Sequence, residues 1–553
     1  MQLSASSLLP STLAIVVLAF GTFGDNASAQ EWPTHLPRKP VADAVRVSEQ
    51  SIFIDGDLNE DAWQSIVPET DLHEFKPVPF ANPRQRTEVR FAFDDRALYI
   101  GARMWDTAPD SILHQLVQRD GGGNTDVFGI WFNCFDDGVN GVRFSVTPDG
   151  VQSDELLTTD GSDGSWNAVW QSECRIDENG WTAEFALPWS VFRFADKGDA
   201  EQQWGMNFYR YIRRYRSDYV WRAMDPNQEG LMNQGGLLSG IRGITPPPRF
   251  SLYPYASTYV NAEDGATNVA VNGGLDLKVG MGEAFTLDMT LVPDFGQVVA
   301  DNLVLNLSPY EVRFNENRQF FTEGTELFNK TRNFYSRRVG AGEQLLNASK
   351  VTGRTSAGTG LGLLNAISQD GNGSLTDFSV AVLDQNLPNN GFVAIQSGQV
   401  IREGDRRDDW VGSAAFEVRD SLQRWSLSGQ TGVNRRSDLN SGEGEGHGWG
   451  LEISRIKGRL QWTAGHYTET PEYDPNAIGF LSAPNAAVDY GRVEYRIPRP
   501  FEVMGIGFNR MSWELNATRE LLHTPRSFVS MEYDLEWRLF LASFDFIKFG
   551  ATT

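Results

Sequence analysis

Residues 531–539 read Met-Glu-Tyr-Asp-Leu-Glu-Trp-Arg-Leu, and they carry the clearest structural signal in the sequence. The odd-numbered residues of this stretch are apolar, whereas the even-numbered residues between them are charged. Because successive side chains of a β-strand point to opposite faces, the alternation predicts a strand with one apolar and one charged face. Similar alternation recurs in residues 285–291, 425–430 and 511–516, so we expect the C-terminal half to be an array of strands.

The N-terminus has the pattern of an export signal. Leu13 to Phe20 form an apolar core, and Ala27-Ser28-Ala29 supplies the small residues that a signal peptidase recognises before Gln30. No Lys or Arg precedes the core, so the α-amino group must supply the positive charge. A short membrane anchor is the alternative, but this core is too short to cross about 30 Å of hydrocarbon as a helix. We expect a signal peptide over residues 1–29 and a linker over residues 30–42.

Pro246-Pro247-Pro248 separates a part of the sequence with short strand-like runs from a part with longer ones. Three consecutive prolines form a stiff, extended connector, which predicts a linker over residues 246–249. Before the prolines, short β-like runs alternate with turn signals such as Asp136-Asp137-Gly138 and Asn179-Gly180. Strands at this spacing predict an antiparallel, jelly-roll-like β-sandwich over residues 43–245.

The longer strands of residues 250–553 admit two interpretations. A soluble sandwich would bury the apolar face as its core, whereas an outer-membrane β-barrel would turn that face towards lipid. The export signal, strands of about 9–11 residues and aromatic residues of the membrane-interface type favour the barrel. Those aromatic residues are Tyr253, Tyr255, Trp410, Trp449, Trp462 and Trp537. The predicted fold class is therefore all-β, with an N-terminal sandwich and a C-terminal transmembrane barrel.

One segment interrupts the strand array. Residues 293–339 are rich in Asn, Glu and Arg and show no sustained period. Long irregular insertions between strands are usually functional. We expect this segment to enter or cap the lumen of the barrel.

Composition excludes several classes of function. The 553 residues include 72 acidic and 48 basic ones, and the resulting net charge of −24 argues against general nucleic-acid binding, because phosphate contacts need a surplus of Lys and Arg. Two Cys exclude zinc sites and iron–sulfur clusters that need three or four cysteine ligands. The HExxH, GxSxG and P-loop patterns do not occur, so no residue is predicted to be catalytic.

Four motifs occur in order in the first half of the chain: Ile54–Trp63 (IDGDLNEDAW), Val89–Ile100 (VRFAFDDRALYI), Thr125–Phe128 (TDVF) and Trp181–Trp189 (WTAEFALPW). With this order and spacing, residues 43–245 resemble carbohydrate-binding module family 9, within the wider DOMON-like group. The resemblance implies a sandwich that binds a carbohydrate ligand. It also implies a structural calcium ion, because such modules often bind one.

A longer and more specific pattern runs from Pro293-Asp294-Phe295 to Phe320–Gly324 (FFTEG) and on to Tyr335-Ser-Arg-Arg338. It resembles the outer-membrane barrel-type domain of unknown function that follows such modules in bacteria. The resemblance implies a β-barrel in contact with outer-membrane lipid. The chain ends in Phe549-Gly-Ala-Thr-Thr553 rather than on the aromatic residue typical of these barrels, which implies an incomplete or unusually closed barrel.

Sugar sites combine an aromatic ring, which stacks on the C–H face of a pyranose, with planar polar groups that bond its hydroxyls. Trp166 and Trp170 lie beside a Gly/Ser/Asp loop that predicts exposure, and two runs of Arg and aromatic residues follow at 207–222. The predicted sugar-binding residues are Trp166, Trp170, Arg210, Arg213 and Trp221. The alternative for each aromatic residue is a place in the core of the sandwich.

Two further features leave alternatives open. Cys134 and Cys174 lie in strand-like runs, and export permits a disulfide between them, with two buried thiols as the alternative. Residues 55–61 carry carboxylates at alternate positions, as calcium loops do, but Ile66 stands where an EF-hand needs Glu. A tight turn explains this segment better than a calcium loop.

The sequence as a whole predicts an exported, carbohydrate-binding outer-membrane protein that captures glycans for uptake or breakdown. A hydrolase that acts on O-glycosyl bonds is the first alternative, although carboxylate pairs are too common among the acidic residues to single out two of them. A structural or transport barrel, whose sandwich binds a protein or peptidoglycan, is the second.

Overall fold

The computed structural model describes residues 39–553 with a number of short exceptions. The exceptions are residues 136–137, 139–140, 159–160, 165, 195–196, 229, 246, 248, 264–265, 283, 294–303, 323, 325, 356, 405–406 and 439–441. The expected signal peptide, most of the linker after it and two of the three consecutive prolines lie outside the described residues.

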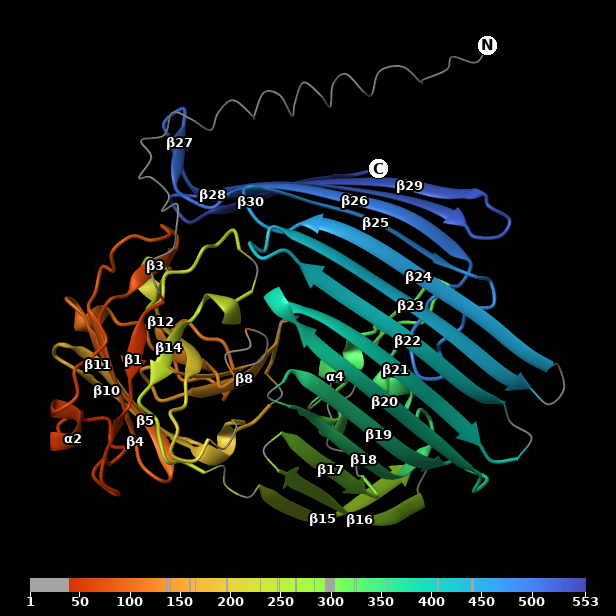
Figure 1. Cartoon of the computed structure of the whole chain (residues 1–553), viewed down its shortest axis with the longest axis horizontal. Coiled ribbons are helices and arrows are strands. Elements are labelled where there is room, and N and C mark those ends of the chain that lie inside the picture. The colour runs from red at the N-terminus through yellow and green to blue at the C-terminus, as the bar shows by residue number, and fades with distance from the viewer. Residues whose placement is uncertain are drawn as a thin grey trace.

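Two facing β-sheets form the N-terminal domain (Figure 1). Among the described residues, the larger sheet comprises β1 (Val41–Asp43), β14 (Gly236–Ser239), β12 (Trp204–Ile212), β6 (Val127–Asn133), β7 (Gly141–Val146), β8 (Gln152–Thr158) and β9 (Gly161–Asp163), with β13 (Ser217–Val220) and β3 (His73–Lys76) beside β12. The smaller sheet comprises β10 (Gln171–Asp177), β11 (Gly180–Pro188), β5 (Ala97–Trp105), β4 (Thr87–Phe93) and β2 (Val45–Arg46). All pairs are antiparallel except β1–β14 and β2–β4. The predicted β-sandwich is confirmed.

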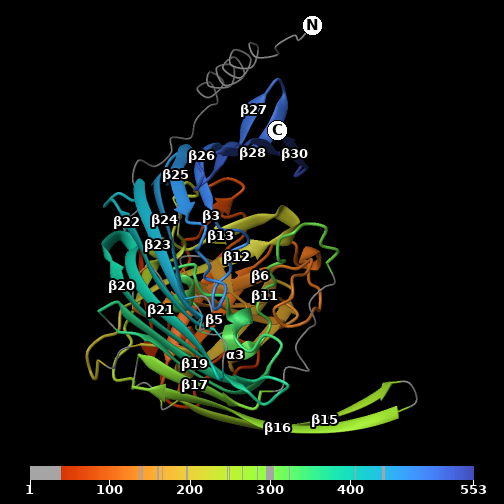
Figure 2. The same ribbon diagram turned by 90° about the vertical axis from the view of Figure 1, so that its right-hand side faces the viewer.

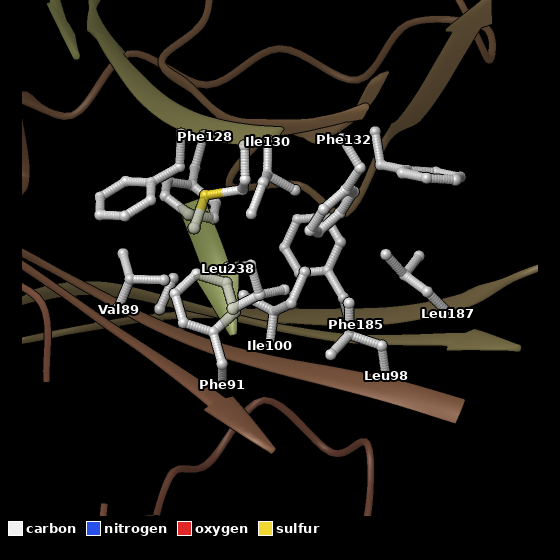
Figure 3. Close-up of a cluster of buried hydrophobic side chains, with 14 of the residues drawn as sticks. Val89, Phe91, Leu98, Ile100, Phe128, Ile130, Phe132, Phe185, Leu187 and Leu238 are labelled. Atoms are coloured by element: carbon white, nitrogen blue, oxygen red, sulfur yellow. The ribbon is translucent and has the colours of Figure 1, made fainter. Parts of the chain in front are cut away.

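Side chains from both sheets meet in an apolar core (Figure 3). Phe128, Ile130 and Phe132 project from β6, and they face residues of β4, β5 and β11. Those facing residues include Val89, Phe91, Leu98, Ile100, Phe185 and Leu187. Burial of each such side chain contributes roughly 1.5–3 kcal/mol, so this core holds the two sheets together.

A single curved sheet of sixteen strands forms the C-terminal domain within the described residues. Its strands are β15 (Phe250–Glu263), β16 (Ala266–Met281), β17 (Phe285–Leu291), β18 (Gln344–Arg354), β19 (Thr359–Gln369), β20 (Leu375–Leu387), β21 (Gly391–Arg402), β22 (Asp408–Arg419), β23 (Trp425–Asp438), β24 (Gly442–Arg455), β25 (Leu460–Glu469), β26 (Ala486–Ile497), β27 (Phe501–Val503), β28 (Ile506–Leu522), β29 (Phe528–Leu541) and β30 (Phe546–Thr552). Each strand from β15 to β26 pairs antiparallel with the next along the chain, as barrel strands do.

The curved sheet is open, because β15 and β30 are each paired along one side in the described structure (Figure 2). The register places apolar residues opposite apolar ones and charged residues opposite charged ones. Trp513 pairs with Trp537 on the convex face, and Glu514 pairs with Glu536 on the concave face. The convex face carries exposed apolar side chains, whereas the concave face carries a buried apolar cluster on β18 to β22 and charged side chains on β28 and β29. The all-β class and the barrel-like second domain are therefore confirmed, with the sheet incomplete as a barrel.

The irregular segment after β17 lies against the concave face of the curved sheet, where we expected it. It contains α3 (Gln319–Thr322), α4 (Glu326–Asn329) and the 3-10 turn η5 (Ser336–Arg338). Phe321, Phe328 and Phe334 of this segment are buried together with residues of β18 to β22. The Nζ of Lys350 on β18 donates to the carbonyl of Phe320 at 2.5 Å, which fixes the segment to the wall. Among the described residues, no helix is long and apolar enough to cross a membrane.

Glu184 of β11 fixes the turn at the start of the sandwich. Its carboxylate accepts hydrogen bonds from the indole N–H of Trp63 at 2.8 Å and from the backbone N–H groups of Asp55 and Gly56 at 3.0 and 2.8 Å. Gly56 has a φ of +84°, a conformation that side chains with a Cβ rarely adopt. The IDGDLNEDAW motif is therefore a tight turn, with the short helix α2 (Asp61–Gln64), held onto the smaller sheet by one buried carboxylate.

Glu184 also predicts a pH dependence of stability. Burial raises the pKa of Glu184 to about 7, although its three N–H donors oppose the shift. Because this pKa exceeds the ordinary value of 4.5, the folded sandwich binds more protons than the unfolded chain between these two pH values. We expect the free energy of unfolding to fall by roughly 3 kcal/mol from this group as pH rises from 4.5 to 7. Urea unfolding of the detergent-solubilised chain, followed by tryptophan fluorescence, measures this.

The Glu184→Gln variant is the control for this prediction, because a glutamine does not titrate. Its unfolding free energy should vary less with pH than that of the parent over the same range. Equal pH slopes for the two proteins would show that Glu184 does not titrate there.

Candidate functional site

The three predicted tryptophans belong to the core rather than to an exposed sugar platform. Trp170 is only 6% exposed and stacks on Phe185 with ring centroids 5.3 Å apart. Trp221 is 2% exposed and stacks on Phe208 at the same distance. Trp166 is partly buried and packs edge-on against Phe144. The predicted exposure of Trp170 and Trp221 is wrong, because their large apolar rings complete the core despite the polar loop beside them.

Arg210 is likewise buried, which corrects its predicted role as a donor to sugar hydroxyls. One of its terminal N–H groups donates to the backbone carbonyls of Arg86 and Trp105, each at 3.0 Å, so it joins β12 to the other sheet. Its guanidinium lies 3.7 Å from the buried carboxylate of Asp106. Arg213, in contrast, is partly exposed and bonds Asn124 at 2.7 Å and the hydroxyl of Tyr211 at 2.9 Å.

The two cysteines are not joined by a disulfide. Cys134 follows β6 in the larger sheet, whereas Cys174 lies on β10 in the smaller one, and both pack against the core. Burial raises the pKa of the Cys174 thiol well above its usual range, which makes it unreactive. The two residues are therefore free thiols, both partly buried.

The acidic residues of the entrance turn do not fit a calcium site. Asp57 is paired with Arg175, and the Oδ1 of Asp55 accepts the backbone N–H of Asp57 at 2.9 Å. Among the described residues, no group of three or more His, Cys, Asp or Glu side chains is arranged to hold a metal ion. The calcium ion implied by the family resemblance therefore has no matching ligand set in the described part of the chain.

A polar and aromatic patch lies on the outward face of the larger sheet, centred on Tyr209. Tyr209 pairs with Gly129 across β12 and β6, and a Cβ at Gly129 would lie only 2.5 Å from the ring of Tyr209. The glycine therefore lets the tyrosine ring lie flat on the sheet. We call this patch the Tyr209 surface, and its residues are Arg143, Ser145, Glu155, Tyr209, Tyr211 and Asp218.

Charged groups flank the ring within the Tyr209 surface. Arg143 of β7 forms an ion pair with Glu155 of β8, and their side chains are 27% and 21% exposed. Burial alone would raise the pKa of Glu155, but the hydrogen bond and charge of Arg143 outweigh it and lower that pKa. Burial raises the pKa of the Tyr209 hydroxyl, which also bonds Ser145. At neutral pH the surface therefore presents a neutral phenol between a guanidinium and a carboxylate.

The alternation of β12 explains why sequence reasoning missed Tyr209. Trp204, Met206, Phe208 and Ile212 point into the core, and this phase sends the odd-numbered residues outward. Arg210 follows the inward phase, so it is buried although it lies between two outward tyrosines. In the sequence, residues 207–216 mix Arg with aromatic residues. The alternation of the apolar residues was the signal that could have separated the inward-facing residues from the outward-facing ones.

Arg210 and Arg213 make a matched pair for testing this assignment. Arg210→Ala should lower the free energy of unfolding of the sandwich by about 3–5 kcal/mol, because it leaves the carbonyls of Arg86 and Trp105 without this donor and removes one of the two guanidinium groups beside Asp106. Arg213→Ala should cost about 1 kcal/mol or less, because its bonds are partly exposed. Urea unfolding followed by tryptophan fluorescence measures both. Equal costs for the two variants would contradict the structural role of Arg210.

Known proteins were compared with the chain by sequence and by structure. A family model described as Domain of unknown function (DUF5916) matches residues 246–553. The carbohydrate binding module family 9 from Caldicellulosiruptor kristjanssonii, solved in complex with glucose, is 13% identical with a TM-score of 0.26, covering 38% of this chain and 97% of the module. OpdK of Pseudomonas aeruginosa, solved with vanillate, is 10% identical with a TM-score of 0.27, covering 75% of this chain and 86% of OpdK. A BenF-like porin from Pseudomonas fluorescens is also 10% identical with a TM-score of 0.27, covering 77% and 91%.

No curated protein matches the chain significantly. The family match begins at the first of the three consecutive prolines and includes the segment whose motifs resemble the barrel-type domain of unknown function. The second part of the resemblance stated from the sequence, a domain of unknown function after the sandwich, is confirmed.

Proposed function

The chain belongs to the DUF5916 family, and we propose that it is a carbohydrate-binding protein of the bacterial outer membrane that captures glycans for uptake or breakdown. The observation that carries the proposal is the Tyr209 surface, a flat ring between charged groups on the outward face of a sandwich. The sandwich is joined to a curved sheet whose convex face is apolar.

The chemistry of the Tyr209 surface suits a sugar. A flat phenol ring offers a face for the C–H side of a pyranose, and its hydroxyl both donates and accepts hydrogen bonds. The planar guanidinium of Arg143 presents donors in a fixed geometry that matches neighbouring hydroxyls. The carboxylate of Glu155 accepts hydrogen bonds from the same kind of group. Resemblance of the sandwich sequence to carbohydrate-binding modules supports the same ligand class.

Two exposed tryptophans support placement of the curved sheet in a membrane. Trp425, at the start of β23, and Trp410, on the neighbouring β22, are about 40% exposed on the convex face. Trp410 pairs with Arg435, ten residues beyond Trp425 on β23. At about 3.4 Å per residue and a tilt of about 40°, the two rings lie roughly 25 Å apart along the barrel axis, which is the usual height of the apolar band.

Loss of the Tyr209 ring should weaken sugar binding. A glycan array identifies the ligand of the full chain in detergent, and calorimetry then compares the parent with Tyr209→Ala and Tyr209→Phe. Stacking on an aromatic ring is worth about 1–3 kcal/mol, with bases as the nearest analogue, so Tyr209→Ala should lose roughly 5- to 150-fold in affinity. Tyr209→Phe keeps the ring and should lose less.

Trp105 provides a matched control, because it is an aromatic residue with an arginine over its ring on the opposite sheet. The guanidinium of Arg103 lies 4.6 Å from the Trp105 ring centroid, and the indole N–H donates to Glu88 at 3.2 Å. Trp105→Ala should bind like the parent. If Trp105→Ala loses affinity and Tyr209→Ala does not, the sugar site lies on the smaller sheet. New reducing ends in the incubated glycan would instead indicate hydrolysis.

Placement in the outer membrane makes a separate prediction. The mature chain should co-fractionate with outer membranes and migrate faster in gels before boiling than after it, because folded barrels resist detergent. Recovery of the chain from soluble periplasm without detergent would contradict the proposal.

A further inference from the structure

The two ends of the curved sheet differ in their connections. At one end the strands are joined by short turns, which we call the short-turn end. Its connections are residues 282–284, 355–358, 388–390, 420–424, 456–459 and 542–545, together with residues 498–505, which contain the short strand β27. At the opposite, long-loop end the chain makes its two longest connections between strands, residues 292–343 and 470–485. In outer-membrane barrels, short turns face the periplasm and long loops face the outside.

The sandwich packs on the short-turn end (Figure 1). Asn233 donates to Gln423 in the turn after β22 at 2.9 Å, and Lys457 in the turn after β24 donates to Gln228 at 3.1 Å. Arg216 donates to the carbonyl of Phe544 in the turn after β29 at 3.2 Å. Three turns of one end thus hold the sandwich, so the whole sandwich lies on one side of the curved sheet.

The convex face is also asymmetric along the strands. Near the short-turn end its residues are apolar, and they include Leu383, Val393, Val418, Leu427, Ile453 and Leu460. Near the long-loop end polar residues stand among apolar ones such as Ile401 and Val433, and they include Asp377, Gln399, Arg435, Glu445, Asp489 and Arg519. Strands such as β23 and β24, of 14 residues each, exceed the 9–11 residues that cross a bilayer. The surplus length with its polar residues therefore extends beyond the membrane at the long-loop end.

From these observations we infer that the sandwich lies in the periplasm and that its Tyr209 surface faces the lumen of the curved sheet. This inference rests on the proposed outer-membrane location. Asp218 of the Tyr209 surface interacts electrostatically with Arg510, which lies on the lumen face of β28 with its guanidinium 3.7 Å from the Phe540 ring centroid. In the side view, β6, β12 and β13 lie beside the strands of the curved sheet (Figure 2). A glycan that passes inward through the lumen therefore meets the sugar-binding face at the periplasmic end.

Cysteine accessibility in intact cells tests this orientation on the full chain. Three single substitutions place a thiol at exposed positions: Asn372→Cys in the turn after β19 at the long-loop end, Leu422→Cys in the turn after β22 at the short-turn end, and Val169→Cys in the sandwich. The probe is a maleimide coupled to a polyethylene glycol too large to pass through porins. The parent, with its two partly buried thiols, gives the background.

We expect Asn372→Cys to label as strongly in intact cells as in permeabilised cells. Leu422→Cys and Val169→Cys should label only after the outer membrane is permeabilised. The reverse pattern, or equal labelling of all three in intact cells, would overturn the periplasmic assignment. If none of the three labels in intact cells and the chain is soluble in the periplasm, the proposed outer-membrane location fails instead.

Discussion

Backbone pairing across the curved sheet is the constraint on which the rest of the structure depends. Each strand satisfies its N–H and C=O groups by pairing with a neighbour, as the proposed membrane location would require. Pairing with a period of two then fixes which residues face outward, and a shift of one residue would move the charged side chains to the convex face. The pairs Trp513–Trp537 and Glu514–Glu536 show this register held across β28 and β29. In a membrane, the outer edges of β15 and β30 would require partner strands as well.

The same period of two divides β12 of the sandwich between stability and recognition. Phe208 and Arg210 point inward, where Phe208 packs in the core and Arg210 bridges the two sheets. Tyr209 and Tyr211 point outward between them. One short run of residues thus serves both purposes, because neighbouring side chains of a strand never share a face. The ring of Tyr209 depends in turn on Gly129, the one residue type that lets an aromatic ring lie against the neighbouring strand.

The turns at the short-turn end of the curved sheet hold the sandwich, so the two ends of the sheet differ. Turns after β22, β24 and β29 hold the sandwich, while the segment after β17 lies along the lumen wall and is fixed there by Lys350 and by buried phenylalanines. A path through the lumen would therefore pass this segment before it reaches the Tyr209 surface. In the proposed function, capture and passage are combined in one chain, because the face of the sandwich that suits a sugar is the face we infer to be turned towards the curved sheet.

The sequence by itself determined the two-part, all-β architecture, because alternation in stretches such as residues 531–539 and the motifs around Trp63 and Trp181 depend on neighbours along the chain. It also predicted the place of the segment after residue 293. Only the tertiary structure decided which aromatic and arginine side chains are buried: a polar loop beside Trp170 suggested exposure, yet Phe185 of another strand covers the ring. The Tyr209 surface, likewise, joins residues of β7, β8, β12 and β13. Which of these meet depends on strand order in the sheet, and strand order is set by contacts between residues far apart in the chain.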